Sequence, residues 1–343
     1  MKRAVWMTAV TCLLICLAGC NGNYDSAQET SAPSVTTSES RLEGEASAQE
    51  HEAKTGRYTV DYPIEAVISD SVFEGYGRLI FPVDDGYYSG ETLGDLKLTW
   101  YNNISPDKTV EIANYMRDHA AAGEPIFFDL YTDEEKVNDP EKENTGLFFF
   151  KGNPGEKFAV CNAGGGFVYV GAMQDSFPHA LELSRQGYNA FALIYRPGAQ
   201  TACEDLARAI TFIFDHAEEL EVNTDGYSLW GGSAGARMAA WVGSYGTAAF
   251  GVDDLPQPAA VIMQYTGLSE YSEGDPATFV TVGESDDIAN WRVMKQRLDG
   301  MSALGIDTEF HSYPGLSHGF GVGTGTVAEG WIDEAIAFWQ EQV

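Results

Sequence analysis

Short apolar runs alternate with amphipathic stretches along the chain after residue 147. The stretches between the runs carry apolar residues at helical spacing, and the runs have the length of buried strands. The strand-like runs are 158–162, 190–195, 227–230, 260–265, 278–282 and 308–313. The helix-like stretches are 176–186, 203–219, 234–242, 291–304 and 327–342. This order predicts an α/β fold with a mostly parallel sheet, helices on both faces and a site beyond the carboxyl ends of the strands.

The chain before residue 147 has a mixed pattern. We expect strands at 72–81 and 96–101 and a helix at 107–122, where the apolar residues recur at helical spacing. The turn residues Asn153, Pro154 and Gly155 separate two apolar runs and predict a hairpin. The sequence thus predicts one domain over 56–343, in which 56–146 supplies N-terminal elements and any cap, and 147–343 forms the core.

The first 55 residues differ in composition from the rest. Residues 1–20 have a basic start, an apolar run and the ending Leu17-Ala18-Gly19-Cys20, which resembles a bacterial lipoprotein signal with Cys20 as the lipidated residue. Residues 21–55 are rich in Ser, Thr, Ala, Glu and Gly and predict a flexible tether. We therefore expect an exported protein held by an N-terminal lipid on the outer face of a bacterial membrane. An ordinary cleaved signal or an uncleaved anchor is the alternative.

Charge narrows the range of partners. The 343 residues carry a formal net charge of −31, which becomes −33 once the two positive charges of Lys2 and Arg3 leave with the signal. Such a field disfavours nucleic acids and anionic membrane surfaces as partners. Two cysteines, Cys161 and Cys203, remain outside the signal and Cys20, and two small buried residues are a better interpretation of them than a disulfide.

The segment Gly231-Gly232-Ser233-Ala234-Gly235 lies between a predicted strand and a predicted helix. A serine on such a sharp turn needs small residues two positions away on either side, and this context makes Ser233 a candidate nucleophile. The N–H of Ala234, at a helix N-terminus, would stabilise an oxyanion. A glycine-rich packing turn is the alternative.

A second glycine-rich loop, Gly164-Gly165-Gly166, directly follows the predicted strand 158–162. Glycines let backbone N–H groups approach a substrate oxygen, so Gly164 or Gly165 is a candidate for the second oxyanion donor. The alternatives are a structural loop with positive φ or a phosphate-binding turn. No Gly-Lys-Ser/Thr follows, which excludes a Walker loop.

The candidate base is His318, in a glycine-flanked loop after the last predicted strand. Its orienting acid is expected in the loop after the preceding strand, where Asp286 is favoured over Asp287 and Glu284. The resulting order of Ser233, Asp286 and His318 is the order found in α/β-hydrolases. The remaining histidines lie in the tether or in predicted helices and strands and suit structural roles: His51, His119, His179, His216 and His311.

From about residue 147 onward the chain resembles the α/β-hydrolase superfamily, and within it secreted acetyl-esterases, acetyl-xylan esterases and feruloyl esterases. The resemblance rests on "NAGGGF", "ALIYRPG", "LWGGSAG", "VGESDDI" and "YPGLSHGF" in the family's order. Two positions depart from the pattern: Ala163 replaces the histidine that commonly precedes the glycines, and Gly232 replaces an acid often found before the serine. The resemblance also implies a structural ion pair of Arg196 with Glu204 or Asp205.

These features together predict a serine esterase that acts on short acyl esters, with a carbohydrate ester as the expected substrate and with no cofactor or metal. A peptidase on the same fold and a non-catalytic, sugar- or partner-binding lipoprotein are the alternatives. The acidic segment 129–146 lacks the glycine and the terminal glutamate of a calcium loop and predicts a solvated surface.

Overall fold

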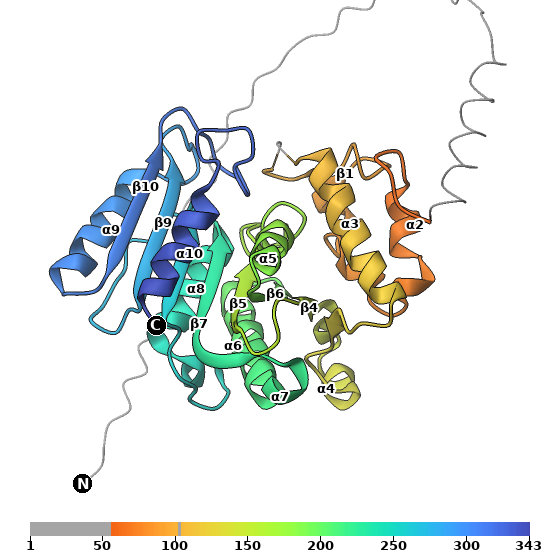
Figure 1. Cartoon of the computed structure of the whole chain (residues 1–343), viewed down its shortest axis with the longest axis horizontal. Coiled ribbons are helices and arrows are strands. Elements are labelled where there is room, and N and C mark those ends of the chain that lie inside the picture. Colours follow the sequence, from red (N-terminus) through yellow and green to blue (C-terminus); the bar gives the residue numbers. More distant parts are fainter. Residues whose placement is uncertain (1–55, 102–103) are drawn as a thin grey trace, which may run out of the picture. The chain divides into compact units, whose positions relative to one another are not determined.

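The computed structural model describes residues 56–101 and 104–343, so the expected signal, Cys20 and the tether lie outside the described residues. An eight-stranded sheet runs through the described part in the order β10-β9-β8-β7-β5-β6-β4-β3 (Figure 1). All the pairings among β5 to β10 are parallel, whereas β4 pairs antiparallel with both β6 and β3. The strands are β3 (Phe127–Phe128), β4 (Gly146–Phe150), β5 (Lys157–Asn162), β6 (Asn189–Ile194), β7 (Asn223–Gly232), β8 (Ala260–Gln264), β9 (Ala277–Gly283) and β10 (Thr308–Tyr313).

Helices connect the parallel strands and cover both faces of the sheet. The chain leaves β5 in one direction along the sheet and leaves β7 in the other, so right-handed crossovers place α5 and α8 on opposite faces. Helix α6 packs against α8, and Trp331 of α10 contacts His179 of α5, which assigns one further helix to each face. These helices are α5 (Ser176–Arg185), α6 (Ala199–Asp215), α8 (Ala234–Tyr245), α9 (Trp291–Ala303) and α10 (Trp331–Glu341), with the short α7 (Ala217–Leu220) after α6.

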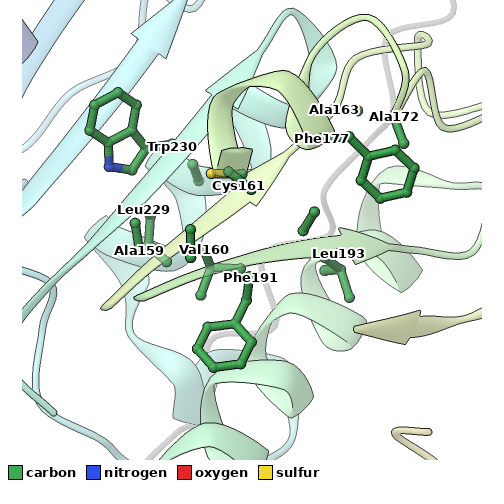
Figure 2. Close-up of a cluster of buried hydrophobic side chains, with 14 of the residues drawn as sticks. Ala159, Val160, Cys161, Ala163, Ala172, Phe177, Phe191, Leu193, Leu229 and Trp230 are labelled. Atoms are coloured by element: carbon green, nitrogen blue, oxygen red, sulfur yellow. The ribbon is translucent and has the colours of Figure 1, made fainter. Parts of the chain in front are cut away.

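The core lies between the central strands and these helices. In Figure 2, Cys161 lies with Trp230 and Phe177 on one side of the strands, and Val160 lies with Phe191 on the other. This alternation follows from the two-residue period of a strand. Strands β4 to β6 are buried along their whole length, as expected for a sheet covered on both faces. Cys161 and Cys203 are both buried, and neither forms a disulfide.

The sequence predictions before residue 147 were partly wrong. Residues 72–81 form two 3₁₀ helices, Ser71–Phe73 and Gly77–Leu79, because Gly75 adopts a φ of +90° that ends any extended run. Within 96–101 only β2 (Lys97–Leu98) is a strand, paired with β1 (Tyr88–Ser89). The predicted helix is confirmed as α3 (Pro106–Ala121), with the Ser105 side chain accepting from the N–H of Lys108 at its start.

The predicted hairpin around Asn153 was also wrong. Both flanking strands exist, but β4 pairs with β6 and β5 pairs with β6 and β7, so the two never pair with each other. Strand β6 therefore lies between them. The last predicted helix begins four residues late, at Trp331, because Gly330 has a φ of +95°.

A buried ion pair fixes the segment after β6. Arg196 and Asp205 are 6% and 0% exposed, and the guanidinium donates to the carboxylate through Nη2 at 2.7 Å and Nε at 3.1 Å. The Arg196 N–H also donates to Asp205 at 2.7 Å, and its Nη1 pairs with Asp139 at 2.7 Å. The expected structural role of Arg196 is thus confirmed, with Asp205 as the main partner and Glu204 only at 4.0 Å. Asp139 belongs to the acidic segment, which forms α4 (Asp133–Asn138) and a 3₁₀ turn.

Two absences hold for the described residues alone. No helix among them is long and apolar enough to span a bilayer. They also contain no group of three or more His, Cys, Asp or Glu side chains placed to hold a metal ion.

Candidate active site

Ser233 lies on the turn between β7 and α8. Its backbone has φ 51° and ψ −113°, a positive-φ conformation that residues other than glycine rarely adopt. The neighbouring glycines make this turn possible: a Cβ on Gly235 would lie 2.1 Å from the carbonyl oxygen of Asn162, and one on Gly231 would lie 2.3 Å from the Gly235 carbonyl carbon. Both outer glycines of the sequence motif are therefore required by close backbone packing. The turn holds the Ser233 side chain at the carboxyl end of the sheet.

The structure brings Ser233, His318 and Asp286 together from three separate loops. The Nε2 atom of His318 lies 3.1 Å from Ser233 Oγ, and Nδ1 lies 2.7 Å from Asp286 Oδ2. The Asp286 side chain is fully buried and the His318 side chain is 8% exposed. The other Asp286 oxygen accepts from the N–H groups of Ile288 and Ala289 at 2.8 and 2.7 Å, which leaves Oδ2 facing the imidazole. These two backbone hydrogen bonds thus orient the carboxylate toward the imidazole.

Strand order explains why these loops meet. Ser233 follows β7, Asp286 follows β9 and His318 follows β10, and all three strands are parallel. Their carboxyl ends lie on the same edge of the sheet. Asp287, the alternative acid, is exposed, and Glu284 is exposed and accepts a hydrogen bond from Ser312 at 2.9 Å. Of these three acids, Asp286 is the one that contacts the His318 imidazole in the described structure.

The glycine loop after β5 lies beside Ser233. A Cβ on Gly164 would lie 2.9 Å from the Ser233 Cβ, so only glycine allows this approach. The Gly164 N–H donates to Asp175 Oδ2 at 2.8 Å and therefore does not point toward a substrate. This removes Gly164 from the two expected donors. The N–H of Gly165 has no hydrogen-bond partner in the described part of the chain. Ala234 is the first residue of α8, so its N–H has no acceptor within the helix.

Sequence reasoning missed Asp175, which lies behind this loop. The residue is completely buried, and its carboxyl accepts from Gly164, from the hydroxyl of Tyr101 at 3.0 Å and from the hydroxyl of Tyr265. Burial raises the pKa of Asp175, while these hydrogen bonds and the nearby His318 act in the opposite direction. Burial also raises the pKa values of Tyr101 and Tyr265 well above 10, so both remain hydroxyl donors. Asp175 is the residue before α5, and its sequence context suggests only a helix cap.

Residues before 102 contribute to the site directly. Tyr101 is 2% exposed and lies near His318, with their ring centroids 6.4 Å apart. Trp100 is 50% exposed and adopts a φ of +70°. A Cβ on Gly166 would lie 2.9 Å from the Trp100 ring, so the indole covers the glycine loop. The N-terminal region therefore supplies one wall of the site through Trp100 and Tyr101, whereas its helix α3 packs on α5.

Two hollows flank the site without including Ser233 or His318. One, of about 580 Å³, lies between the start of α3 and the loop after His318 and is lined by Lys108, Gln174 and Phe320 among others. The other, of about 390 Å³, is lined by Tyr87, Tyr169 and further side chains. Both are open to solvent, and neither is a closed tunnel for a long acyl chain.

Comparisons with known proteins agree with this architecture. A family model described as BD-FAE matches residues 152–259. Esterase 2 of Thermogutta terrifontis, solved after phosphorylation by paraoxon, superposes with a TM-score of 0.51 at 22% identity and covers 57% of this chain and 88% of its own. An acetyl ester-xyloside bifunctional hydrolase of Caldicellulosiruptor lactoaceticus superposes with a TM-score of 0.56 at 19% identity and covers 63% of this chain and 95% of its own. No curated protein matches the sequence. The chain has the α/β-hydrolase fold.

Proposed function

We propose that this protein is a serine carboxylesterase that hydrolyses short acyl esters, with a carbohydrate as the preferred alcohol. The observation that carries the proposal is the continuous hydrogen-bond chain from Ser233 Oγ through His318 to Asp286, at 3.1 and 2.7 Å. A serine within reach of a histidine that is itself oriented by a buried carboxylate is the arrangement that activates a hydroxyl nucleophile.

The reaction divides into acylation and deacylation. Ser233 Oγ attacks the ester carbonyl carbon while His318 Nε2 takes the hydroxyl proton, and the same proton then leaves with the alcohol. The N–H groups of Ala234 and Gly165 stabilise the oxyanion of each tetrahedral intermediate. A water molecule, deprotonated by His318, releases the carboxylic acid and regenerates the serine. Asp286 holds the imidazole and stabilises the imidazolium.

Three observations support a small acyl group on a carbohydrate. Neither of the two open hollows is a closed tunnel for a long acyl chain, which favours a small acyl group. The half-exposed indole of Trp100 beside the glycine loop offers an aromatic surface of the kind on which sugar rings stack. The structural similarity to an acetyl ester-xyloside hydrolase points in the same direction.

We also propose that the protein is exported and anchored by lipidation of Cys20, because the first 20 residues have the charge, length and ending of a lipoprotein signal. Expression of the full chain with Cys20→Ala should move activity from the membrane fraction to the soluble fraction. Unchanged membrane association of this variant would contradict the anchor.

The proposed activity is tested with p-nitrophenyl acetate and a fluorophosphonate probe. Ser233→Ala should lower kcat by several orders of magnitude and abolish labelling, because the nucleophile is lost. Ser272→Ala, at an exposed serine outside the site, is the matched control and should behave as the unmodified enzyme. Normal turnover by Ser233→Ala would refute the mechanism. A panel of acetyl, butyryl, octanoyl and feruloyl esters tests the acyl preference, and a higher kcat/KM for octanoyl than for acetyl esters would refute it.

A further inference from the structure

The loop that bears Gly165 is held on both sides of Gly164. The Gly164 carbonyl accepts from the N–H of Gly171 at 2.9 Å, and the Gly164 N–H donates to Asp175 at 2.8 Å. Because the peptide unit is planar and trans, an oriented Gly164 carbonyl aims the following N–H, that of Gly165, in the opposite direction. The direction of this donor is therefore set directly by the bond from Gly171 to the Gly164 carbonyl, and the Asp175 bond holds the preceding peptide unit, so that the loop is fixed on both sides of Gly164.

Asp175 is the only side chain in this arrangement that contacts the Gly164 backbone by a hydrogen bond in the described structure. As the residue before α5, an aspartate would normally accept from the free N–H groups of the helix, yet its side chain makes no such bond. The carboxyl instead turns into the protein toward Gly164. Burial of a carboxyl costs free energy, and the hydrogen bonds that Asp175 accepts from Gly164, Tyr101 and Tyr265 offset this cost.

Two tyrosines fix the carboxyl in this position. Tyr101 donates to Oδ2, the oxygen that also accepts from Gly164, and Tyr265 donates to Oδ1. Tyr265 also lies against the catalytic imidazole, with its ring centroid 4.8 Å from that of His318. The position commonly held by a histidine in similar loops is Ala163 here, whose side chain offers no hydrogen bond, although its carbonyl accepts from Tyr195 at 2.6 Å.

From this geometry we infer that Asp175 is a positioning residue of the oxyanion hole: it holds the Gly164 N–H and thereby keeps the Gly165 N–H directed at the developing oxyanion. The inference rests on the proposed esterase function. Asp175 contacts neither the substrate nor the reacting atoms. Its contribution is confined to the transition state, where the negative charge on the carbonyl oxygen develops, so its loss should lower kcat and leave KM nearly unchanged.

The test compares Asp175→Ala with Asp175→Asn. Alanine removes the acceptor, and kcat for p-nitrophenyl acetate should fall by about 10² to 10³, the range for loss of one oxyanion donor. Asparagine is nearly the same size, and its carbonyl oxygen still accepts from Gly164. This variant should therefore stay within about tenfold of the unmodified enzyme, which corresponds to a difference of one ordinary hydrogen bond. The affinity for a trifluoromethyl ketone, whose adduct with Ser233 carries an oxyanion, should fall in Asp175→Ala in parallel with kcat/KM.

Asp275 supplies the matched control, because it too is a buried carboxylate, 7% exposed and paired with Arg297 at 2.8 Å. Asp275→Ala should lower the melting temperature without changing kcat at a temperature well below it. A normal kcat in Asp175→Ala, or a loss of 100-fold or more in folded Asp175→Asn, would overturn the inference. The asparagine result decides the matter if the alanine variant does not fold. Full activity of Ser233→Ala would instead refute the esterase function itself, so the two failures are distinguishable.

Discussion

The strained backbone at Ser233 makes a prediction about stability that is independent of activity. At φ 51° and ψ −113° the residue occupies a region in which an L-residue costs about 1–3 kcal/mol, whereas glycine adopts it freely. Ser233→Gly and Ser233→Ala both remove the hydroxyl and its bond to His318, but only glycine relieves the strain. Glycine costs about 0.5–1 kcal/mol more in chain entropy. The glycine variant should therefore be more stable than the alanine variant by about 1 kcal/mol.

Thermal unfolding followed by circular dichroism measures this difference. For a domain of this size, about 1 kcal/mol corresponds to a melting temperature higher by about 2 °C in Ser233→Gly than in Ser233→Ala. The control pair is Thr211→Gly and Thr211→Ala in the middle of α6, where glycine should be the less stable by about 1 kcal/mol. If Ser233→Gly melts at or below the temperature of Ser233→Ala, the turn is not strained, and the structural basis given for presentation of the nucleophile is wrong.

Three further predictions concern buried side chains that can carry a charge. Asp286→Ala should lower kcat by about 10⁴, and Asp287→Ala, at the exposed neighbour, should not, as measured with p-nitrophenyl acetate. Asp205→Ala should destabilise the fold by about 3 kcal/mol in urea unfolding, because the buried Arg196 guanidinium keeps only the partly exposed Asp139 as a close partner; a loss below 1 kcal/mol would contradict this. Burial lowers the pKa of His179 to about 4, so the unfolded chain takes up a proton at this residue at a higher pH than the folded protein does. The free energy of unfolding should therefore be highest above about pH 6.5 and fall as the pH falls toward 4. Between pH 7 and 5 the unmodified protein should lose about 2 kcal/mol more of this free energy than His179→Leu.

The sequence predicted those parts of the fold that rest on local patterns. All six strands after residue 157 and the helices between them appear close to their expected positions, because buried parallel strands are continuous apolar runs and amphipathic helices have a fixed period. The failures lie where a local pattern has more than one outcome. The run 72–81 is apolar enough for a strand, but Gly75 turns the chain at a φ of +90°. The first 3₁₀ turn packs against α3 and the second against the helix Ile64–Ile68.

Some residues of the candidate site could also be predicted from local motifs, and others could not. Ser233, Asp286 and His318 could be found because each lies in a short motif at a defined place after a strand. Asp175 could not, because its partners Gly164, Tyr101 and Tyr265 lie 11, 74 and 90 residues away in the chain. Trp100 and Tyr101 likewise gave no signal, since their role depends on how the N-terminal region folds back over the glycine loop. Such contacts belong to the tertiary structure and have no sequence period.

The departures from the family pattern become consistent once Asp175 is included. A Cβ on Gly232 would lie 2.6 Å from Asp175 Oδ2, so an acid at position 232 and the observed position of Asp175 exclude each other. Glycine at 232 leaves the space in which the Asp175 carboxyl reaches Gly164, and this carboxyl braces the glycine loop where Ala163 offers no side-chain hydrogen bond. The glycine loop is therefore held beside Ser233 by Asp175, which needs the space left by Gly232 and makes the hydrogen bond that the Ala163 side chain cannot make. A substitution at Gly232 should act on catalysis through the displaced Asp175, even though residue 232 touches no reacting atom.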